Sequence, residues 1–434
     1  MKWELALRFF SLQDANVRYV LFGSMLLAGA TGVIGCFAFL RKRSLVGDAI
    51  AHAALPGVCL AYLLFESKEP YVLLAGAILA GWGGTLLIDF IRENTRLKED
   101  AAIAIVLSVF FGAGIALLTV IQHSGRASQA GLDKFLFGQA ASLMSKDVWV
   151  LGVLALLLWA AVWLAFKEFK VYAFDPEFAR GIGLPVRGIE IALTTLIVAG
   201  IAIGLQMVGI VLMAALLITP AAAARQWTDH LPRMVILAGV LGALSGAAGA
   251  FTSALAPRMP TGPWMVVTVT FFFVASLLFA PRRGVAARVW RQAVSRATIA
   301  AENVVTTLYR LDEREGAPRS SWPPEAILRY RPMTPAKLEG LLRRLFRQGL
   351  VAFDGRGWAL SEEGESRARR IVRRHRLWEL YLTEQLQLPA HRVHQDAEEI
   401  EHWLSQAQEE ELVALLDQPL LDPHAREIPR IQPG

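Results

Sequence analysis

The chain has 434 residues, of which 54% are apolar and 19% are charged, and a formal net charge of +6. Part of the positive charge lies in loop Arg and Lys residues, so it does not by itself indicate nucleic-acid binding. The two cysteines, Cys36 and Cys59, lie within apolar runs, which excludes a disulfide framework and indicates small core residues.

Residues 17–280 form a series of long apolar runs separated by short polar breaks. A run of about twenty apolar residues is long enough to cross a bilayer as a helix. The sequence therefore predicts nine membrane spans. Their approximate bounds are 17–40, 45–65, 70–91, 101–121, 148–166, 187–206, 207–224, 234–256 and 263–280. The sixth and seventh spans are almost fused, and they meet near Gln206 and Met207.

The distribution of Arg and Lys predicts how the spans are oriented. Fifteen of these residues fall in one set of alternate loops, whereas the opposite set, including the N-terminus, holds eight. Loops rich in Arg and Lys stay on the cytoplasmic side of a membrane. We therefore expect the C-terminus in the cytoplasm and the N-terminus outside.

Asp48 and His52 interrupt the second predicted span. Residues four apart lie on the same face of a helix, and a carboxylate and an imidazole are both ligands for divalent cations. Ionisable groups are costly inside a membrane and usually mark an ion pathway. The pair therefore predicts a metal path, and the alternative is a structural pair bonded across helices.

The loop between the fifth and sixth spans, residues 167–186, has the pattern of a short helix. Asp175 suits the N-cap, Pro176 suits the first turn, and Gly183 suits the end of the helix. The orientation places this helix on the cytoplasmic side. It would be either a passive connector or a docking element for a cytosolic partner.

After Pro281 the chain becomes rich in Arg and Glu and has the pattern of a soluble domain. Residues 284–315 are predicted to be a helical linker. Within residues 316–364 we expect a short helix from Glu325, a second helix capped by Thr334, and a hairpin that turns at residues 354–357. This order is that of a winged helix. Residues 365–434 form the last predicted domain, and residues 362–388 and 391–416 are predicted to be helices.

The membrane part resembles the permease subunits of ABC importers for zinc, manganese and iron. Four stretches match that family: 43–58 (RSLVGDAIAHAALPGV), 98–105 (KEDAAIAI), 136–139 (LFGQ) and 212–225 (LMAALLITPAAAAR). The resemblance implies that residues 1–283 form a metal permease domain and that Asp48 and His52 line the metal path. It also places the family's ATPase-coupling helix at about 176–185. The coupling residues would be Pro176, Glu177, Arg180 and Gly183.

Residues 302–430 resemble metal-dependent repressors of the diphtheria-toxin-repressor and manganese-transport-regulator type. The matching stretches are 375–379 (HRLWE), 393–402 (VHQDAEEIEH) and 422–424 (DPH). The resemblance implies two metal sites. The first would use His375, Glu379 and His394, and the second would use Glu398, Glu401 and His402. Glutamate at 398, where the repressors have cysteine, favours Mn²⁺ or another hard ion such as Fe²⁺.

One part of the repressor pattern is altered. The repressors complete the second site from their first helix, where this chain has Asn303 and Thr306 instead of acidic or sulfur ligands. The second site is therefore expected to be incomplete or weak. The first helix also leads directly from the membrane, so we do not expect the domain to bind DNA.

The sequence thus predicts an all-α polytopic membrane protein with about nine spans, followed by a cytoplasmic winged helix and a helical domain of metal-binding and dimerisation type. It would be a permease subunit in the bacterial cytoplasmic membrane that imports manganese, zinc or iron. The chain has no G-x-x-x-x-G-K-[ST] phosphate loop, so it would not be an enzyme and ATPase subunits would hydrolyse ATP.

The resemblance implies further partners and no cofactor for transport itself. An extracytoplasmic metal-binding protein would deliver the ion, and a second permease subunit, identical or related, would complete the path. The C-terminal domain would bind Mn²⁺ or Fe²⁺ and regulate transport. The alternative is a membrane-tethered, metal-responsive transcription regulator, which requires the winged helix to bind operator DNA.

Overall fold

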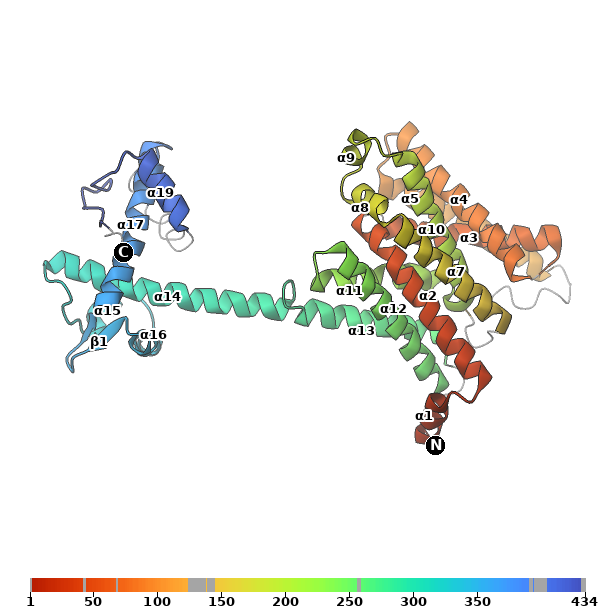
Figure 1. The fold of residues 1–434 in the computed structure, drawn as a ribbon, viewed down its shortest axis with the longest axis horizontal. Helices are drawn as coiled ribbons and strands as arrows, with labels where there is room; N and C mark the ends of the chain where they lie inside the picture. The colour runs from red at the N-terminus through yellow and green to blue at the C-terminus, as the bar shows by residue number, and fades with distance from the viewer. Residues whose placement is uncertain are drawn as a thin grey trace. The chain divides into compact units, whose positions relative to one another are not determined.

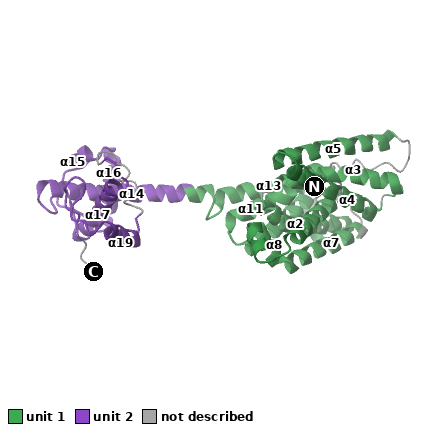
Figure 2. Ribbon diagram, turned by 90° about the horizontal axis from the view of Figure 1, so that it is seen from above, with its two compact units in different colours: residues 1–288 green, residues 289–434 purple. Residues whose placement is uncertain are grey.

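The computed structural model describes residues 2–41, 44–67, 69–123, 138, 145–255, 259–389, 393 and 404–430. The chain divides into two compact units, residues 1–288 and 289–434, which are coloured separately in Figure 2. Within the described residues nearly all regular structure is helical, and two short strands lie in the second unit (Figure 1).

The first unit is a bundle of long apolar helices. Its helices are α1 (Lys2–Ser11), α2 (Ala15–Leu40), α3 (Ser44–Phe65), α4 (Pro70–Asn94), α5 (Glu99–His123), α7 (Ser145–Leu164), α8 (Phe166–Phe174), α9 (Pro176–Gly181), α10 (Val186–Val208), α11 (Ile210–Trp227), α12 (Leu231–Ala254) and α13 (Thr261–Phe279). Among the described residues, nine of these helices are long and apolar enough to cross a membrane. The nine predicted spans are confirmed.

Helix α2 lies at the centre of the bundle. In its most apolar stretch 78% of the residues are buried, the largest share for any of the candidate spans in the described chain. Glycines allow this burial because they bring backbones into contact. A Cβ at Gly35 would lie 1.8 Å from the carbonyl oxygen of Leu217 on α11, and one at Gly242 of α12 would lie 2.1 Å from that of Ala28.

A single glycine separates the sixth and seventh spans. Gly209 ends α10 and begins α11 with φ 86° and ψ 163°, a conformation that essentially only glycine adopts. The sequence placed this junction near Gln206 and Met207, and the break lies two residues later. Here the backbone conformation, and not a polar loop, ends the helix.

The second unit begins within a long helix. Helix α14 (Val285–Glu315) crosses the boundary between the two units, and its C-terminal half packs into an apolar core. That core also takes residues from α15 (Pro324–Tyr330), α16 (Pro335–Arg347), β1 (Val351–Phe353) and β2 (Trp358–Leu360). The predicted linker helix is therefore also the first helix of the soluble unit.

The winged-helix order predicted from the sequence is present. Helices α15 and α16 precede the antiparallel pair β1–β2, in which Val351 lies opposite Leu360 and Phe353 lies opposite Trp358. The Asp354 carboxylate accepts hydrogen bonds from the backbone N–H groups of Arg356 and Gly357, both at 2.9 Å. These bonds fix the turn, so the short hairpin forms where the turn residues predicted it.

Among the described residues, the second unit has two further helices, α17 (Glu362–Glu384) and α19 (Gln406–Leu415). The prediction of one continuous helix over residues 391–416 is wrong, because the helix at its C-terminal end begins anew at Gln406. Ser405 has an extended backbone and caps α19, with reciprocal bonds to Gln408 that form a capping box. Residues 390–392 and 394–403 lie outside the described residues.

Candidate functional site

Asp48 and His52 lie on consecutive turns of α3. His52 Nε2 is 3.5 Å from Asp48 Oδ1, and the side chains are 14% and 35% exposed, respectively. The helix continues through Pro56 to Phe65, so both residues lie in the N-terminal half of the span. The predicted pair therefore forms one polar site in an apolar helix.

Helix α5 covers His52. The ring of Phe111 stands edge-on to the imidazole with centroids 4.8 Å apart. His52 Nδ1 is buried and has no hydrogen-bond partner among the described residues. A buried ring nitrogen without a partner is costly. One nitrogen of His52 thus faces Asp48, and the other has an unmet bonding capacity.

The pair can supply two metal ligands, one oxygen and one nitrogen. Within the described residues no group of three or more His, Cys, Asp or Glu side chains is placed to hold a metal ion. A divalent cation at this pair would need further ligands from water or another molecule. A site with only two protein ligands binds an ion weakly, which suits an ion in transit.

The predicted coupling segment forms helix α9. The Asp175 carboxylate caps it by accepting a hydrogen bond of 2.9 Å from the backbone N–H of Phe178. Glu177 and Arg180 form a largely exposed ion pair of 3.3 Å across one turn. Gly183 follows with φ +83°, the left-handed conformation that ends helices.

Helix α9 has one buried side and one exposed apolar side. Ala179 is completely buried against the membrane unit, whereas Phe178 and Ile182 are 57% and 53% exposed. The exposed pair lies next to the Glu177–Arg180 ion pair in sequence. The helix is therefore held firmly and presents a mixed apolar and charged surface.

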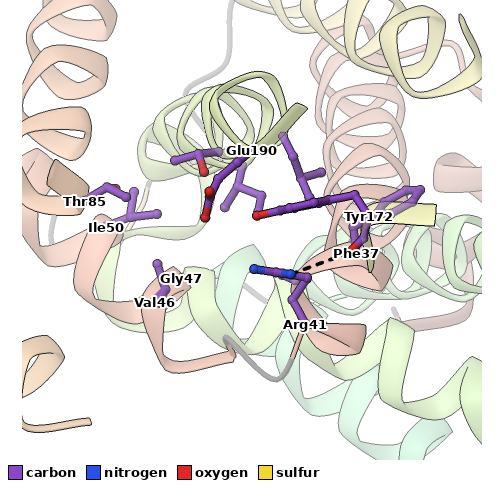
Figure 3. Close-up of a pocket in the computed structure, with 12 residues that line it drawn as sticks. Phe37, Arg41, Val46, Gly47, Ile50, Thr85, Tyr172 and Glu190 are labelled. Carbon is purple, nitrogen blue, oxygen red and sulfur yellow. Dashed lines mark hydrogen bonds between the residues drawn. The ribbon is translucent and has the colours of Figure 1, made fainter. Parts of the chain in front are cut away.

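A pocket lies between α2, α3, α4, α8 and α10 (Figure 3). Arg41 stacks on the Tyr172 ring at 4.2 Å and donates to the Tyr172 carbonyl at 3.5 Å. Glu190 points into the same space, and Gly47 and Ile50 of α3 line it. The sequence analysis missed Glu190. Its signal was a lone carboxylate in the predicted sixth span.

In the second unit, His375 and Glu379 face each other on α17. His375 Nε2 is 3.1 Å from Glu379 Oε1, and both side chains are almost fully buried. The chemistry and spacing of this pair fit two ligands of a metal site. The other four predicted ligands, His394, Glu398, Glu401 and His402, lie outside the described residues.

Glu302 and Thr306, from the altered first helix, have other roles. Glu302 forms an ion pair of 2.6 Å with Arg367 of α17. The Thr306 hydroxyl donates to the Asn303 carbonyl at 3.1 Å. The bond turns the Thr306 oxygen back onto its own helix, in keeping with a second site that lacks ligands from this helix.

Comparison with known proteins identifies both units. The family model "ABC 3 transport family" matches residues 13–280. The manganese transport system membrane protein MntC of Bacillus subtilis is 43% identical over 379 residues, which cover 87% of this chain and 86% of that protein. The chain belongs to the ABC 3 transport family. A second model, for the metal-binding and dimerisation domain of iron-dependent repressors, matches residues 361–430.

Other ABC 3 family proteins resemble the membrane unit. The zinc transport system membrane protein TroC of Treponema pallidum is 41% identical over 286 residues, which are 66% of this chain but 95% of that protein. The solved structure of PsaBC from Streptococcus pneumoniae in complex with Fab matches with a TM-score of 0.58 and 30% identity. The matched region covers 64% of this chain and 97% of the chain in the PsaBC structure.

Family membership fixes the general role of the chain. ABC 3 proteins of this kind are permease subunits and are not themselves enzymes. They work with an ATPase and a substrate-binding protein.

Proposed function

We propose that this ABC 3 permease imports a divalent transition metal, with manganese as its main cargo. The observation that carries the proposal is the Asp48–His52 pair, which puts a carboxylate oxygen 3.5 Å from an imidazole nitrogen within a membrane span. Such a pair is costly in lipid and suits a metal pathway. The similarity to MntC, a manganese transport protein, supports the choice of metal.

Asp48 and His52 receive the ion after it has lost part of its water shell. Mn²⁺ accepts oxygen and nitrogen ligands, and neither ligand here is a thiolate that would select softer ions. The pair is too small to satisfy the ion, so a second permease subunit or retained water supplies the remaining ligands. Zn²⁺ and Fe²⁺ would fit the same ligands, and Mg²⁺, which prefers oxygen ligands and holds its water, would fit poorly.

Helix α9 transmits the force of ATP hydrolysis to the path. Its Asp175 cap and buried Ala179 hold it against the bundle, and its exposed Phe178 and Ile182 offer a surface to an ATPase subunit. Pro176, Glu177, Arg180 and Gly183 shape that surface. The excess of Arg and Lys in the loops on this side supports a cytoplasmic location for α9 and the second unit.

The second unit senses metal inside the cell and restrains uptake when metal is abundant. His375 and Glu379 would hold Mn²⁺ or Fe²⁺ there, together with ligands from residues 394–402. The geometry of the pair supports this role, because an imidazole nitrogen and a carboxylate oxygen lie 3.1 Å apart in a buried position.

The transport proposal is tested by uptake of radioactive Mn²⁺ into vesicles that contain the permease, its ATPase and its binding protein. We expect ATP-dependent uptake that unlabelled Mn²⁺ and Zn²⁺ suppress and that equal Mg²⁺ leaves unchanged. Uptake that Mg²⁺ suppresses equally well would overturn the choice of a transition metal.

The sensing proposal is tested with His375→Ala and Glu379→Gln in the intact chain. Truncation is a poorer test, because α14 supplies core residues to the second unit and removal of their partners would expose them. We expect both variants to keep uptake at low internal Mn²⁺ and to lose its suppression at high internal Mn²⁺. Unchanged suppression in both variants would contradict the sensing role.

A further inference from the structure

The N-terminal half of α14, residues 285–299, connects the last candidate span to the core of the second unit. The last candidate span, α13, ends at Phe279, and the apolar core of the second unit begins on α14 at Ala301. Between them the large apolar side chains are open to solvent. Val285, Val289, Trp290 and Val294 are 43%, 58%, 72% and 47% exposed, respectively.

These apolar residues lie on one side of the helix. At about 100° per residue, Val285, Val289, Trp290 and Val294 fall within an arc of about 180°. The arc also includes several alanines. Gln292 lies outside the arc, about 160° around the helix from Val294. A Trp within such an arc is typical of a helix that lies at a membrane–water interface.

The charges of this segment are all positive. Arg288, Arg291 and Arg296 lie between Val285 and Ala301, and that stretch contains no Asp or Glu. Arg288 and Arg291 lie on the polar side of the arc, and Arg296 lies at its border, between Val285 and Val289. Arginines in these positions attract anionic lipid head groups, and a long side chain at the border can extend to them. A second copy of the chain would cover the apolar arc equally well, but it would bring two sets of arginines together.

The chain itself places this segment beside the membrane. Residues 280–284 are not helical, and Ala280 leaves the helical conformation with ψ 131° before Pro281. The first turns of α14 thus begin only a few residues beyond a membrane span.

We infer that residues 285–299 form an interfacial helix that binds anionic phospholipid, with Val289, Trp290 and Val294 in the lipid and Arg288, Arg291 and Arg296 at the head groups. The helix would fix the first turns of α14 to the bilayer surface. This inference concerns lipid recognition and stands independently of the transported metal.

The test uses the full-length protein in nanodiscs with a spin label at Val294→Cys, and at Gln292→Cys, about 160° around the helix from Val294, as the matched control. The native Cys36 and Cys59 are 0% and 1% exposed, so the unmutated protein should take little label. Collision rates with oxygen report lipid contact, and those with a water-soluble nickel chelate report exposure to water.

With phosphatidylglycerol present, we expect a several-fold higher ratio of oxygen to nickel collisions at 294 than at 292. The difference should shrink in phosphatidylcholine alone and in 1 M salt, where the Debye length falls to about 3 Å. Equal exposure of both labels to nickel in phosphatidylglycerol would overturn the inference. So would a short label-to-label distance between two copies at 294 that persists in every lipid and in detergent.

The charge requirement has its own test. In the triple variant Arg288→Gln, Arg291→Gln and Arg296→Gln, the ratio of oxygen to nickel collisions at 294 should no longer depend on phosphatidylglycerol. A control variant changes three exposed arginines on α15 and α16, Arg329→Gln, Arg343→Gln and Arg347→Gln, and should keep it. Retention of the dependence in the first variant, or its loss in both, would contradict the role given to these arginines.

Discussion

The guanidinium of Arg376 on α17 holds the carboxylate of Glu313 on α14 through two hydrogen bonds, of 3.0 and 2.6 Å. Arg376 is almost fully buried, and its Nε also lies 3.6 Å from the buried carboxylate of Asp422. The residue before it, His375, belongs to the proposed metal pair. The helix with the sensing residues is therefore tied to the helix that begins just beyond the last membrane span.

Replacement of Arg376 by methionine should loosen this connection. The change leaves the Asp422 carboxylate buried without its cation, which costs about 3 kcal/mol. Because every 1.4 kcal/mol is tenfold, hydrogen exchange of the α14 amides from 304 to 312 should rise by about 100-fold. The matched control is Arg343→Met, since Arg343 pairs with Glu339 at the exposed surface of α16. Equal protection of the α14 amides from hydrogen exchange in Arg376→Met and Arg343→Met would refute the connection.

The contact between α3 and α4 should not tolerate a single added methyl group. A Cβ at Gly76 would lie 2.4 Å from the carbonyl oxygen of Gly57, and backbone at that distance has to move. We expect Gly76→Ala to lower the stability in detergent by about 1–3 kcal/mol, measured as an earlier thermal transition. Gly112→Ala on α5 is the control, because nothing lies within 4 Å of its added Cβ. A similar transition for both variants would argue against close packing at Gly76.

Loss of the exposed apolar side chains of α9 should uncouple the ATPase. In Phe178→Ala combined with Ile182→Ala, we expect the ATPase subunit to co-purify poorly and metal-stimulated ATP hydrolysis to fall at least several-fold. The helix itself should persist, because Asp175 and Ala179 are unchanged. Leu79→Ala on α4 removes a residue that is 74% exposed elsewhere and should have no effect. If the ATPase subunit still co-purifies and metal still stimulates ATP hydrolysis in the double variant, α9 is not the coupling helix.

The stability of the hairpin turn should fall at acid pH, because the Asp354 carboxylate becomes protonated there. Hydrogen bonds from the backbone N–H groups of Arg356 and Gly357 lower the pKa of Asp354 below its ordinary value of 3.8. The carboxylate therefore stabilises the folded turn above that value, and this stabilisation is lost as the pH falls through the folded-state pKa. Carbon NMR of Asp354 in the 289–434 unit should give a midpoint below 3.8. A midpoint at or above 3.8 would mean that the two bonds do not form in solution.

Length and apolar composition were enough to predict the spans, because a helix in lipid must satisfy its own backbone bonds over about twenty residues. Local chemistry likewise predicted α9 from Asp175 and Gly183 and the hairpin from its turn. The resemblance already assigned residues from 302 onward to the repressor-like domain, but no local pattern showed that Leu308 packs in the core of the second unit. That role depends on α16 and the hairpin folding back against α14, which no local pattern specifies.

The pairing of distant residues was also beyond sequence reasoning. Asp48 and His52 are four apart, so their contact follows from helix geometry, but Glu190 and Arg41 come from different helices and share a pocket only after folding. The cap at Ser405 is a different case. Its signal, Ser405 followed three residues later by Gln408, is present in the sequence, and the apolar residues on both sides of it concealed the break.

The central claim is that metal passes between Asp48 and His52, and uptake of Mn²⁺ by the reconstituted complex tests it most directly. Asp48→Asn keeps the size of the side chain and removes its charge, His52→Ala removes the imidazole, and His123→Ala, at the exposed end of α5, is the control. The account predicts loss of at least nine tenths of uptake in the first two variants and none in the third, with equal amounts of assembled complex. Unchanged uptake in both Asp48→Asn and His52→Ala would contradict it.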